Sequence, residues 1–217
     1  GLSLSAILAL NDNILPQANQ AFQITTKATN YLDIQFTLPS YDIIEEEANG
    51  NIYQRIMMPE AGTTLESGLP ELPTLSIMLA IPRQGSVQIE TLNSQTEVIA
   101  QFLPYPVQEE QDSASPKSFV IDNAYYENGV PYPANLIQIS DPVILRDFRL
   151  VGIQVNPFSY NPLNHTLTII PSVSFRINYL NEPGINELEG ELQFISPAFA
   201  NIYESIIFNF DDYRNLI

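Results

Sequence analysis

Apolar and polar side chains alternate along several stretches of the chain, and this pattern predicts its fold class. An alternation with a period of two is typical of β-strands that bury one face. It is clearest where four apolar side chains share one face: Leu32, Ile34, Phe36 and Leu38. The stretches that show it are residues 31–38, 86–92, 150–155, 166–170 and 172–179.

Turn-forming residues separate these stretches. They occur as Asn-Gly, Asn-Pro and Pro-Gly pairs, which favour tight turns, at positions 49–50, 128–129, 156–157, 161–162 and 183–184. Residues 160–166 are the loop of a predicted hairpin. About ten short strands at this spacing are typical of antiparallel sandwiches. The sequence therefore predicts an all-β protein, a β-sandwich of the jelly-roll or Greek-key type.

Three segments depart from the alternating pattern. Residues 68–73 contain two prolines three positions apart, which favours a stiff extended segment. It leads into the continuously apolar residues 74–82, a predicted central strand. Residues 196–197, Ser-Pro, match the start of a helix, and apolar residues follow at helical spacing. We expect one domain over residues 1–217, with a short C-terminal helix and residues 208–217 as an exiting arm.

Two segments are rich in acidic residues. Pro104–Lys117 combines them with three prolines, which predicts a long exposed loop. Glu45, Glu46 and Glu47 form an acidic run. Carboxylates suit Ca²⁺, but the spaced Asp/Asn/Gly pattern of a calcium loop is missing. We therefore interpret the run as a solvated acidic loop and expect no metal site.

The charge balance excludes several classes of partner. The 217 residues include 8 basic and 25 acidic side chains, which gives a net charge of −17 at pH 7. A field of this sign repels phosphate groups, so nucleic acid and anionic lipid are excluded. No apolar run approaches the ~20 residues of a membrane helix, and we expect no membrane insertion. The first residues lack a basic segment, so we expect that any signal peptide has already been removed.

The side-chain inventory argues against an enzyme. The chain has no Cys and a single His, His165, which rules out a thiol nucleophile, a disulfide and a multi-His metal site. A Ser-His-Asp triad would have to use His165, which lies in the predicted hairpin loop and is interpreted as a surface residue. A stand-alone hydrolase is therefore the weakest alternative. We expect a binding or structural role without a cofactor.

The tyrosines support a second hypothesis about function. Tyr125, Tyr126 and Tyr132 lie close together in the sequence. On a β-sandwich they could form a platform on which sugars stack, whereas edge packing with exposed hydroxyls is the simpler interpretation. They support a carbohydrate-binding or adhesive module of a bacterial surface protein. Arg146 and Asp147 are expected to form an ion pair at a strand end.

One ordered set of segments carries more information than any of its parts: Gly68–Pro73 with Leu79–Pro82, Ser140–Arg149, Val155–Pro157 with Tyr160–Pro162, and Phe199–Phe210. Taken in this order along the chain, they resemble the N-terminal propeptide of the gingipain-type (family C25) cysteine peptidases. Ser140–Arg149 is the most specific of them, and the similarity spans roughly residues 30–214.

The resemblance implies a non-catalytic part of a secreted zymogen. In this family the prodomain is a β-sandwich packed on the catalytic domain of its cognate cysteine peptidase. It assists folding of the peptidase and blocks the active-site cleft until it is cleaved. The catalytic Cys and His would then lie beyond residue 217. The implied location is extracellular or at the cell surface, reached through the periplasm.

The resemblance also implies candidate site residues. The inhibitory loop of relatives maps to Glu109, Glu110, Gln111, Asp112 and Lys117. Arg-specific relatives place an Arg near Gln111, so this chain departs from their pattern. Three explanations are open: its peptidase is not Arg-specific, Lys117 enters the specificity pocket, or another loop blocks the cleft. A cation suits the acidic specificity pocket of such enzymes, which slightly favours Lys117. Arg214 aligns with the basic residue that ends the propeptide in relatives, and is a candidate processing site or an exposed tail residue.

Overall fold

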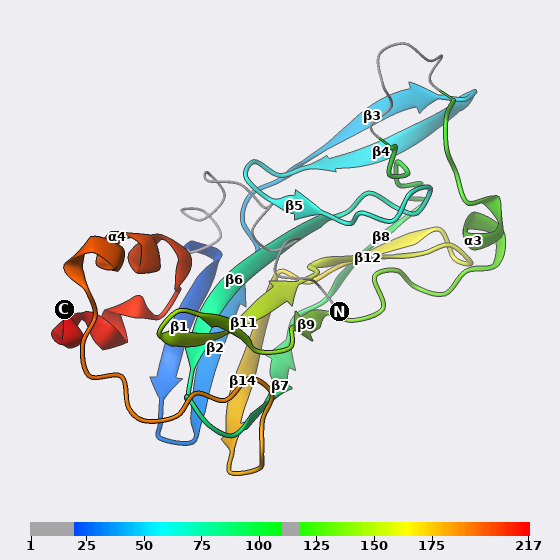
Figure 1. The fold of residues 1–217 in the computed structure, drawn as a ribbon. Helices are drawn as coiled ribbons and strands as arrows, with labels where there is room; N and C mark the ends of the chain where they lie inside the picture. Colours follow the sequence, from blue (N-terminus) through cyan, green and yellow to red (C-terminus); the bar gives the residue numbers. More distant parts are fainter. Residues whose placement is uncertain (1–19, 110–117) are drawn as a thin grey trace.

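The computed structural model describes residues 20–109 and 118–217, and two antiparallel sheets packed face to face dominate it (Figure 1). The first sheet has four strands, in the order β1 (Phe22–Lys27), β2 (Tyr31–Thr37), β14 (Ser172–Leu180) and β7 (Ser86–Ser94). The second has the order β10 (Val143–Leu145), β11 (Phe148–Val155), β6 (Pro73–Ile81) and β5 (Gly62–Thr63), with β9 (Ile137–Ile139) also paired to β11. The predicted all-β sandwich is confirmed.

The main hydrophobic core lies between these two sheets. Its central strands, β2, β14, β6 and β11, each contribute alternate side chains. The buried residues include Leu32, Ile34, Phe36, Leu75, Ile77, Leu79, Val151, Ile153, Val155, Val173, Phe175 and Ile177. The apolar face predicted from residues 31–38 thus faces this core, and burial of these side chains is the main term that holds the sheets together.

Strand β6 is buried on both faces, which explains why its sequence is continuously apolar. Ile77 and Leu79 point into the core between the sheets. Met78 and Ala80 point to the other side, into a second core. That second core is covered by residues 195–217, which we call the C-terminal cap.

The C-terminal cap packs on the outer face of the second sheet. Its helices are α4 (Pro197–Ile206) and the 3₁₀ helix η1 (Phe210–Leu216). Ser196 is extended and Pro197 occupies the first turn, so the helix starts where the sequence predicts. Tyr203 and Phe210 are buried against Phe148 of β11. Residues 208–217, expected to form an exiting arm, lie within this cap.

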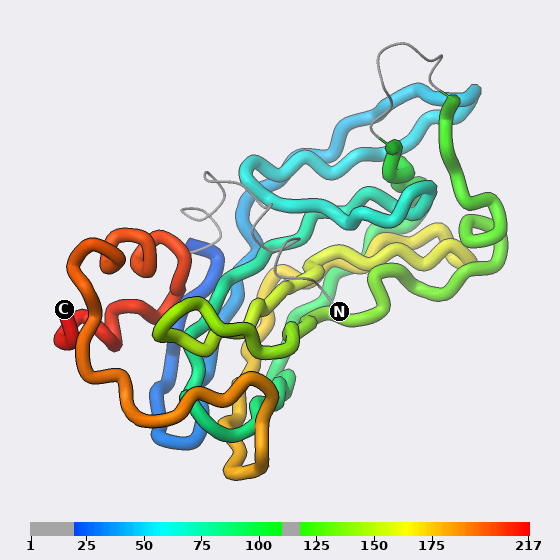
Figure 2. Tube along the Cα trace, in the orientation of Figure 1, coloured from blue at the N-terminus to red at the C-terminus, as the bar shows by residue number. Residues whose placement is uncertain are grey.

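A distal lobe extends from one end of the sandwich (Figure 2). Its elements are β3 (Asp42–Ala48), β4 (Asn51–Met57), β8 (Glu97–Ala100), β12 (Phe158–Asn161), β13 (Thr166–Ile169) and the short helix α3 (Asn123–Asn128). Strand β8 follows β7 directly, and β14 follows β13, with a bend between the two strands of each pair. The two bends meet near Pro171, where Gln95 N donates to Ser172 O at 2.9 Å. Two long strand runs therefore cross from the first sheet into the distal lobe, whose own core includes Leu72, Phe158 and Tyr160.

The acidic run Glu45–Glu47 lies in a strand, so the expectation of a solvated loop is wrong. Strands β3 and β4 pair along their whole length. Asn49 and Gly50 between them have φ of 48° and 78°, the left-handed values that a tight hairpin turn of Asn-Gly requires. The turn determines the register, and Glu45 and Glu47 remain exposed on the hairpin.

Arg146 and Asp147 do not form the expected ion pair. The guanidinium of Arg146 lies 3.8 Å from the centre of the Phe199 ring, a cation–π contact. The carboxylate of Asp147 accepts a hydrogen bond of 2.9 Å from the hydroxyl of Tyr203. Each side chain therefore has its own partner on α4, and the pair joins the C-terminal cap to the β10–β11 turn.

Truncation in the shared strand β6 should be costly. We predict that Leu79→Ala, at a residue with no exposed surface, lowers the free energy of unfolding by about 2–5 kcal/mol. Leu92→Ala in β7, where 45% of the residue is exposed, should cost far less. Urea unfolding followed by circular dichroism measures both, and equal losses would contradict the assignment of β6 to the core.

Candidate functional site at the neck of the 110–117 segment

The chain enters the 110–117 segment through a paired base in the distal lobe, which we call the neck, residues 103–109 and 118–122. The first limb lies between β4 and residues 69–71. Gln54 N donates to Leu103 O at 2.7 Å, and Tyr105 N donates to Gln54 O at 3.0 Å. On the other side, Glu71 N donates to Tyr105 O at 2.8 Å. The first limb is therefore a strand-like element.

The expectation of an exposed loop over Pro104–Lys117 is therefore wrong for its first residues. Pro104, Tyr105 and Pro106 are buried. The composition of Pro104–Lys117 is typical of a loop, but the backbone of its first residues pairs with Gln54 and with residues 69–71, which are distant in the sequence. Residues 110–117 lie outside the described residues.

Gly68 joins the two limbs of the neck. Its N–H donates to Val107 O at 2.9 Å, and its carbonyl accepts from Asp122 N at 3.0 Å. Its φ is +79°, and an added Cβ would lie 2.9 Å from the backbone N of Asp122. Both facts require glycine. This gives a physical reason for the glycine at the start of the Gly68–Pro73 segment.

The side chain of Gln108 closes the neck. Its Oε1 accepts from Val120 N at 2.9 Å. Its Nε2 donates to Val120 O and to Pro106 O, both at 2.9 Å. One side-chain amide thus satisfies the backbone donor and acceptor of the opposite limb, as a neighbouring strand would.

Three aromatic rings pack beneath the neck. Phe119 of the second limb lies 5.4 Å from Tyr53 of β4 and 5.8 Å from Tyr105 of the first limb, measured between ring centres. Tyr53 and Tyr105 themselves meet edge to face at 5.8 Å. Such pairs add stability beyond the area that they bury. They hold both limbs against the β3–β4 hairpin.

Arg55 provides the positive charge at this base. Its Nη2 donates to both carboxylate oxygens of Glu71 at 2.9 Å, its Nη1 to Glu46 at 3.0 Å, and its guanidinium lies 4.8 Å from the ring centre of Tyr105. Burial acts to lower the pKa of Arg55, but the hydrogen bonds to Glu71 and Glu46 outweigh it and raise the pKa. The ion pairs neutralise part of the acidic run.

The candidate inhibitory residues are placed only in part. Glu109 is exposed at the end of the first limb. Glu110, Gln111, Asp112 and Lys117 lie outside the described residues. What the structure provides is the base on which their segment begins and ends.

The predicted tyrosine cluster surrounds helix α3. Tyr125 lies 5.4 Å from Tyr126 and 6.0 Å from Tyr132 in edge-to-face contacts. The hydroxyl of Tyr125 donates to Tyr160 O at 3.2 Å, and that of Tyr126 donates to Pro104 O at 3.0 Å. The rings pack on one another and fasten α3 to the neck, rather than forming a row of open faces.

Arg214, the candidate processing residue, lies in η1 and not in a free tail. Its guanidinium forms ion pairs with Glu204 of α4 and Asp211 of η1. These contacts raise the pKa of Arg214 above its ordinary value, with the Glu204 hydrogen bond as the largest cause. The side chain remains half exposed.

The other chemical candidates form no site. His165 is exposed in the β12–β13 turn, and its Nδ1 lies 3.1 Å from the hydroxyl of Tyr160. Among residues 20–109 and 118–217, no group of three acidic, His or Cys side chains is placed to hold a metal ion. None of the helices in the described part of the chain combines the length and apolar character needed to cross a membrane.

The domain is a peptidase propeptide by class. A family model described as Propeptide_C25 matches residues 19–217. The chain therefore belongs to this family of non-catalytic propeptides of cysteine peptidases, and the resemblance seen in the sequence is confirmed.

Curated relatives and solved structures agree with this assignment. Gingipain R2 of Porphyromonas gingivalis is 24% identical over 193 residues, and Lys-gingipain of the same species is 22% identical over 203. These matches cover 83% and 88% of this chain, which spans only 25% and 12% of those relatives. The fold matches a complex of the RgpB pro- and mature domains with a TM-score of 0.77 and 23% identity, covering 88% of this chain and 97% of that one. A structure on the zymogenic latency of gingipain K matches with a TM-score of 0.62 and 18% identity, over 73% of this chain and 91% of that one.

Sequence reasoning missed the residues that build the neck. Gln108, Phe119 and Arg55 carry no motif, and Gly68 was noticed only as part of a proline-rich segment. Their roles depend on partners far away in the sequence. A local signal existed only for Gly68, since glycine before a stiff segment often marks a positive φ.

Removing the Gln108 clamp should loosen the neck. We predict that Gln108→Ala speeds hydrogen exchange at the Val120 amide by about 2- to 10-fold, because an intramolecular hydrogen bond contributes roughly 0.5–1.5 kcal/mol. Exchange followed by mass spectrometry on a peptide that spans residues 118–124 measures it. Gln88→Ala on the exposed strand β7 is the control, and an unchanged Val120 would refute the clamp.

Burial of the tyrosines should make the fold sensitive to alkali. Burial raises the pKa of Tyr132 and of Tyr160 to about 12, from 10.0. Their neutral forms are favoured in the fold, so this stability is present below about pH 10 and is lost as the pH rises through about 12. We predict a lower free energy of unfolding at about pH 11 than at about pH 8. Urea unfolding at the two pH values measures it, and equal free energies of unfolding would contradict it.

Proposed function

We propose that this chain is the prodomain of a secreted gingipain-like cysteine peptidase, and that the 110–117 segment blocks the active-site cleft. The observation that carries this proposal is the neck. It ties both ends of a segment of eight residues to one base by backbone pairing, the Gln108 amide and the Phe119 contacts. Membership of the propeptide family supports the same role.

A fixed base helps inhibition because it lowers the entropy lost on binding. A segment whose two ends are already held has fewer conformations to lose when it enters a cleft. Covalent linkage to the peptidase would add an effective concentration of roughly millimolar. An intrinsic dissociation constant of about 1 μM, or about −8 kcal/mol, would then leave only about one cleft in a thousand open.

Lys117 is the side chain that we assign to the specificity pocket. Its cation suits the acidic pocket of a peptidase that cuts after basic residues. Glu109, Glu110, Gln111 and Asp112 would flank it as the rest of the inhibitory segment. Cleavage after Arg214 would separate the prodomain from the peptidase, and before that event the prodomain would assist folding.

The partner of this prodomain is the catalytic domain of its cognate cysteine peptidase. The relatives support this pairing, since one structure of similar fold is a complex of pro- and mature domains. We place the protein outside the cell or at the cell surface, exported through the periplasm, as its gingipain relatives suggest.

Inhibition by the 217-residue chain tests this function. We predict that it slows its mature cognate peptidase, and that Lys117→Ala raises the inhibition constant about 10- to 100-fold, the loss expected for a buried anchor. Steady-state hydrolysis of a basic peptide substrate measures the constant. Arg146→Ala, which removes a cation from the β10–β11 turn, should leave the inhibition constant unchanged.

Two results would count against the blocking role. One is an inhibition constant that does not change when residues 110–117 are replaced by a Gly-Ser linker of equal length. The other is equal weakening by Lys117→Ala and Arg146→Ala. Circular dichroism and urea unfolding would show whether each variant keeps the fold of the parent chain.

A further inference from the structure

The end of the C-terminal cap completes an open edge of strand β6. On that side β5 pairs only with Pro73 and Thr74, so the rest of this edge meets no strand among the residues that the structure describes. Residues 207–209 lie there instead. Phe208 N donates to Met78 O at 2.8 Å, beside a bridge between Met78 and Ile207.

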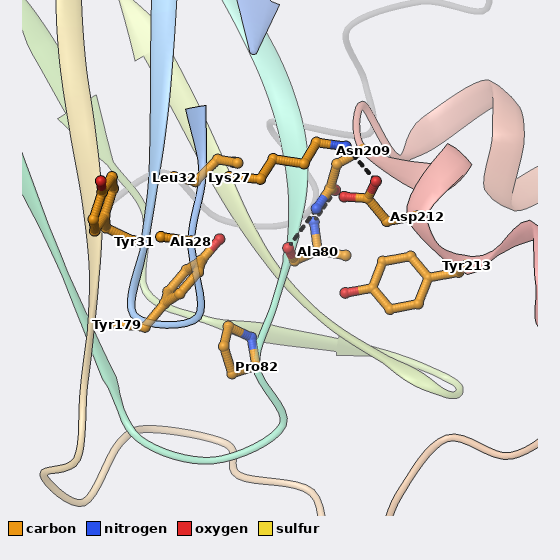
Figure 3. A pocket seen from close by; sticks show the side chains of 10 residues that line it. All are labelled: Lys27, Ala28, Tyr31, Leu32, Ala80, Pro82, Tyr179, Asn209, Asp212 and Tyr213. Carbon is orange, nitrogen blue, oxygen red and sulfur yellow. Dashed lines mark hydrogen bonds and ion pairs between the residues drawn. The ribbon is translucent and has the colours of Figure 1, made fainter. Parts of the chain in front are cut away.

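Asn209 continues this edge with its side chain. Its Oδ1 accepts from Ala80 N at 2.8 Å, and its Nδ2 donates to Ala80 O at 2.9 Å (Figure 3). Asn209 is buried, with 6% of its surface exposed. The side-chain amide thus satisfies both the N–H and the C=O of Ala80 in the buried strand β6, which no apolar side chain could do.

Further contacts hold the last residues to the second core, to α4 and to β1. Phe210 is buried in the second core, and Lys27 of β1 forms an ion pair with Asp212 (Figure 3). This ion pair is half exposed, and such pairs contribute little. The centre of the Tyr213 ring lies 5.0 Å from that of Phe148, and Leu216 also packs on the second core. The hydrogen bonds of Phe208 and Asn209 to β6 and these apolar contacts together hold η1.

Two hollows border η1, and Tyr213 lines both of them. One, of about 180 Å³, is lined by Tyr179, Asp212 and Tyr213 among others (Figure 3). The other, of about 320 Å³, is lined by Tyr213 and Leu216 together with residues of β6 and β11. Most residues of η1 are also exposed, whereas nearly all those of β6 beneath it are buried, and exposed elements open locally more readily than the core.

The peptide bond after Arg214 is protected in this arrangement. The carbonyl of Arg214 accepts from Ile217 N at 3.3 Å, and Ile195 N donates to Leu216 O at 2.7 Å. A peptidase must take the carbonyl of the scissile bond into its oxyanion hole. The 3₁₀ turn therefore has to open before this bond can be cut.

We infer that residues 207–217 form a latch on the edge of β6, and that processing after Arg214 proceeds only when this latch detaches. The inference rests on the proposed cleavage at Arg214. When opening is fast relative to cleavage, the rate of cleavage follows the population of the open form. The hydrogen bonds of Asn209 therefore slow processing of the chain, although Asn209 lies five residues before Arg214.

Limited trypsin digestion of the 217-residue chain tests the latch. Trypsin cuts after Lys and Arg, and intact mass spectrometry follows release of the tripeptide Asn215–Ile217. Asn209→Leu keeps the branched shape of the side chain but removes both hydrogen bonds, and should speed this cut about ten-fold or more. Asn209→Asp keeps the acceptor for Ala80 N but sets a buried carboxylate against Ala80 O in place of the donor, and should also speed the cut.

A matched control lies in the distal lobe. The hydroxyl of Thr64, also buried, donates to Pro70 O at 2.6 Å and accepts from Leu72 N at 3.0 Å. Thr64→Val removes the same number of side-chain hydrogen bonds far from η1, and should leave the cut after Arg214 unchanged. An equal acceleration by both variants would show that cleavage follows global unfolding, and would overturn the inference. An unchanged rate in Asn209→Leu would also overturn it.

Hydrogen exchange of the unaltered chain gives a second test that needs no variant. The amides of Phe208 and Ile217 should exchange with a lower opening free energy than those of Leu79 and Ile153. Equal values would mean that the latch never opens alone, and would refute the inference. Neither test uses the cognate peptidase, so a failure of the proposed inhibition can be told apart from a failure of the latch.

Discussion

Strand β6 has no face turned to water, and the rest of the structure depends on this burial. One side of the strand belongs to the core between the sheets, and the other to the core beneath the C-terminal cap. The two cores therefore share one backbone and stabilise each other through it. The cap is required by this arrangement, because without it Met78 and Ala80 would be exposed beside Phe148 and Leu150.

The elements that could be predicted are those that local pattern determines. Alternation identified β2, β7, β11 and β14, the continuous apolar run identified β6, and Ser196-Pro197 identified the start of α4. Strands β5, β9 and β10 have only two or three residues, too few for a period to show. The strand at the acidic run Glu45–Glu47 could not be predicted from the run itself. It forms because of the Asn49-Gly50 turn and the pairing with β4, not because of its own side chains.

The candidate site could be predicted only as a region. Charge and proline content pointed to Pro104–Lys117, and the family resemblance pointed to the same place. The part of this region that the structure describes, residues 104–109, is a strand-like limb that is buried at 104–106, because Gln54 and Glu71 supply backbone partners that no local pattern reveals. The same limit applies to Arg214, whose sequence context suggests a tail although Asn209 anchors its helix to a strand 129 residues earlier. The roles of Lys117 and Arg214 stay predictions.

The way in which Gln108 and Gly68 tie off the neck has a consequence for how this family can diversify. The hydrogen bonds that join the two limbs are made by Gly68 and by the Gln108 amide, outside the interval between the limbs. We therefore expect substitutions, insertions or deletions in that interval to leave the scaffold folded. Natural variation could thus retune the inhibitor to a new enzyme by exchanging a short cassette, while the sandwich that carries it stays the same.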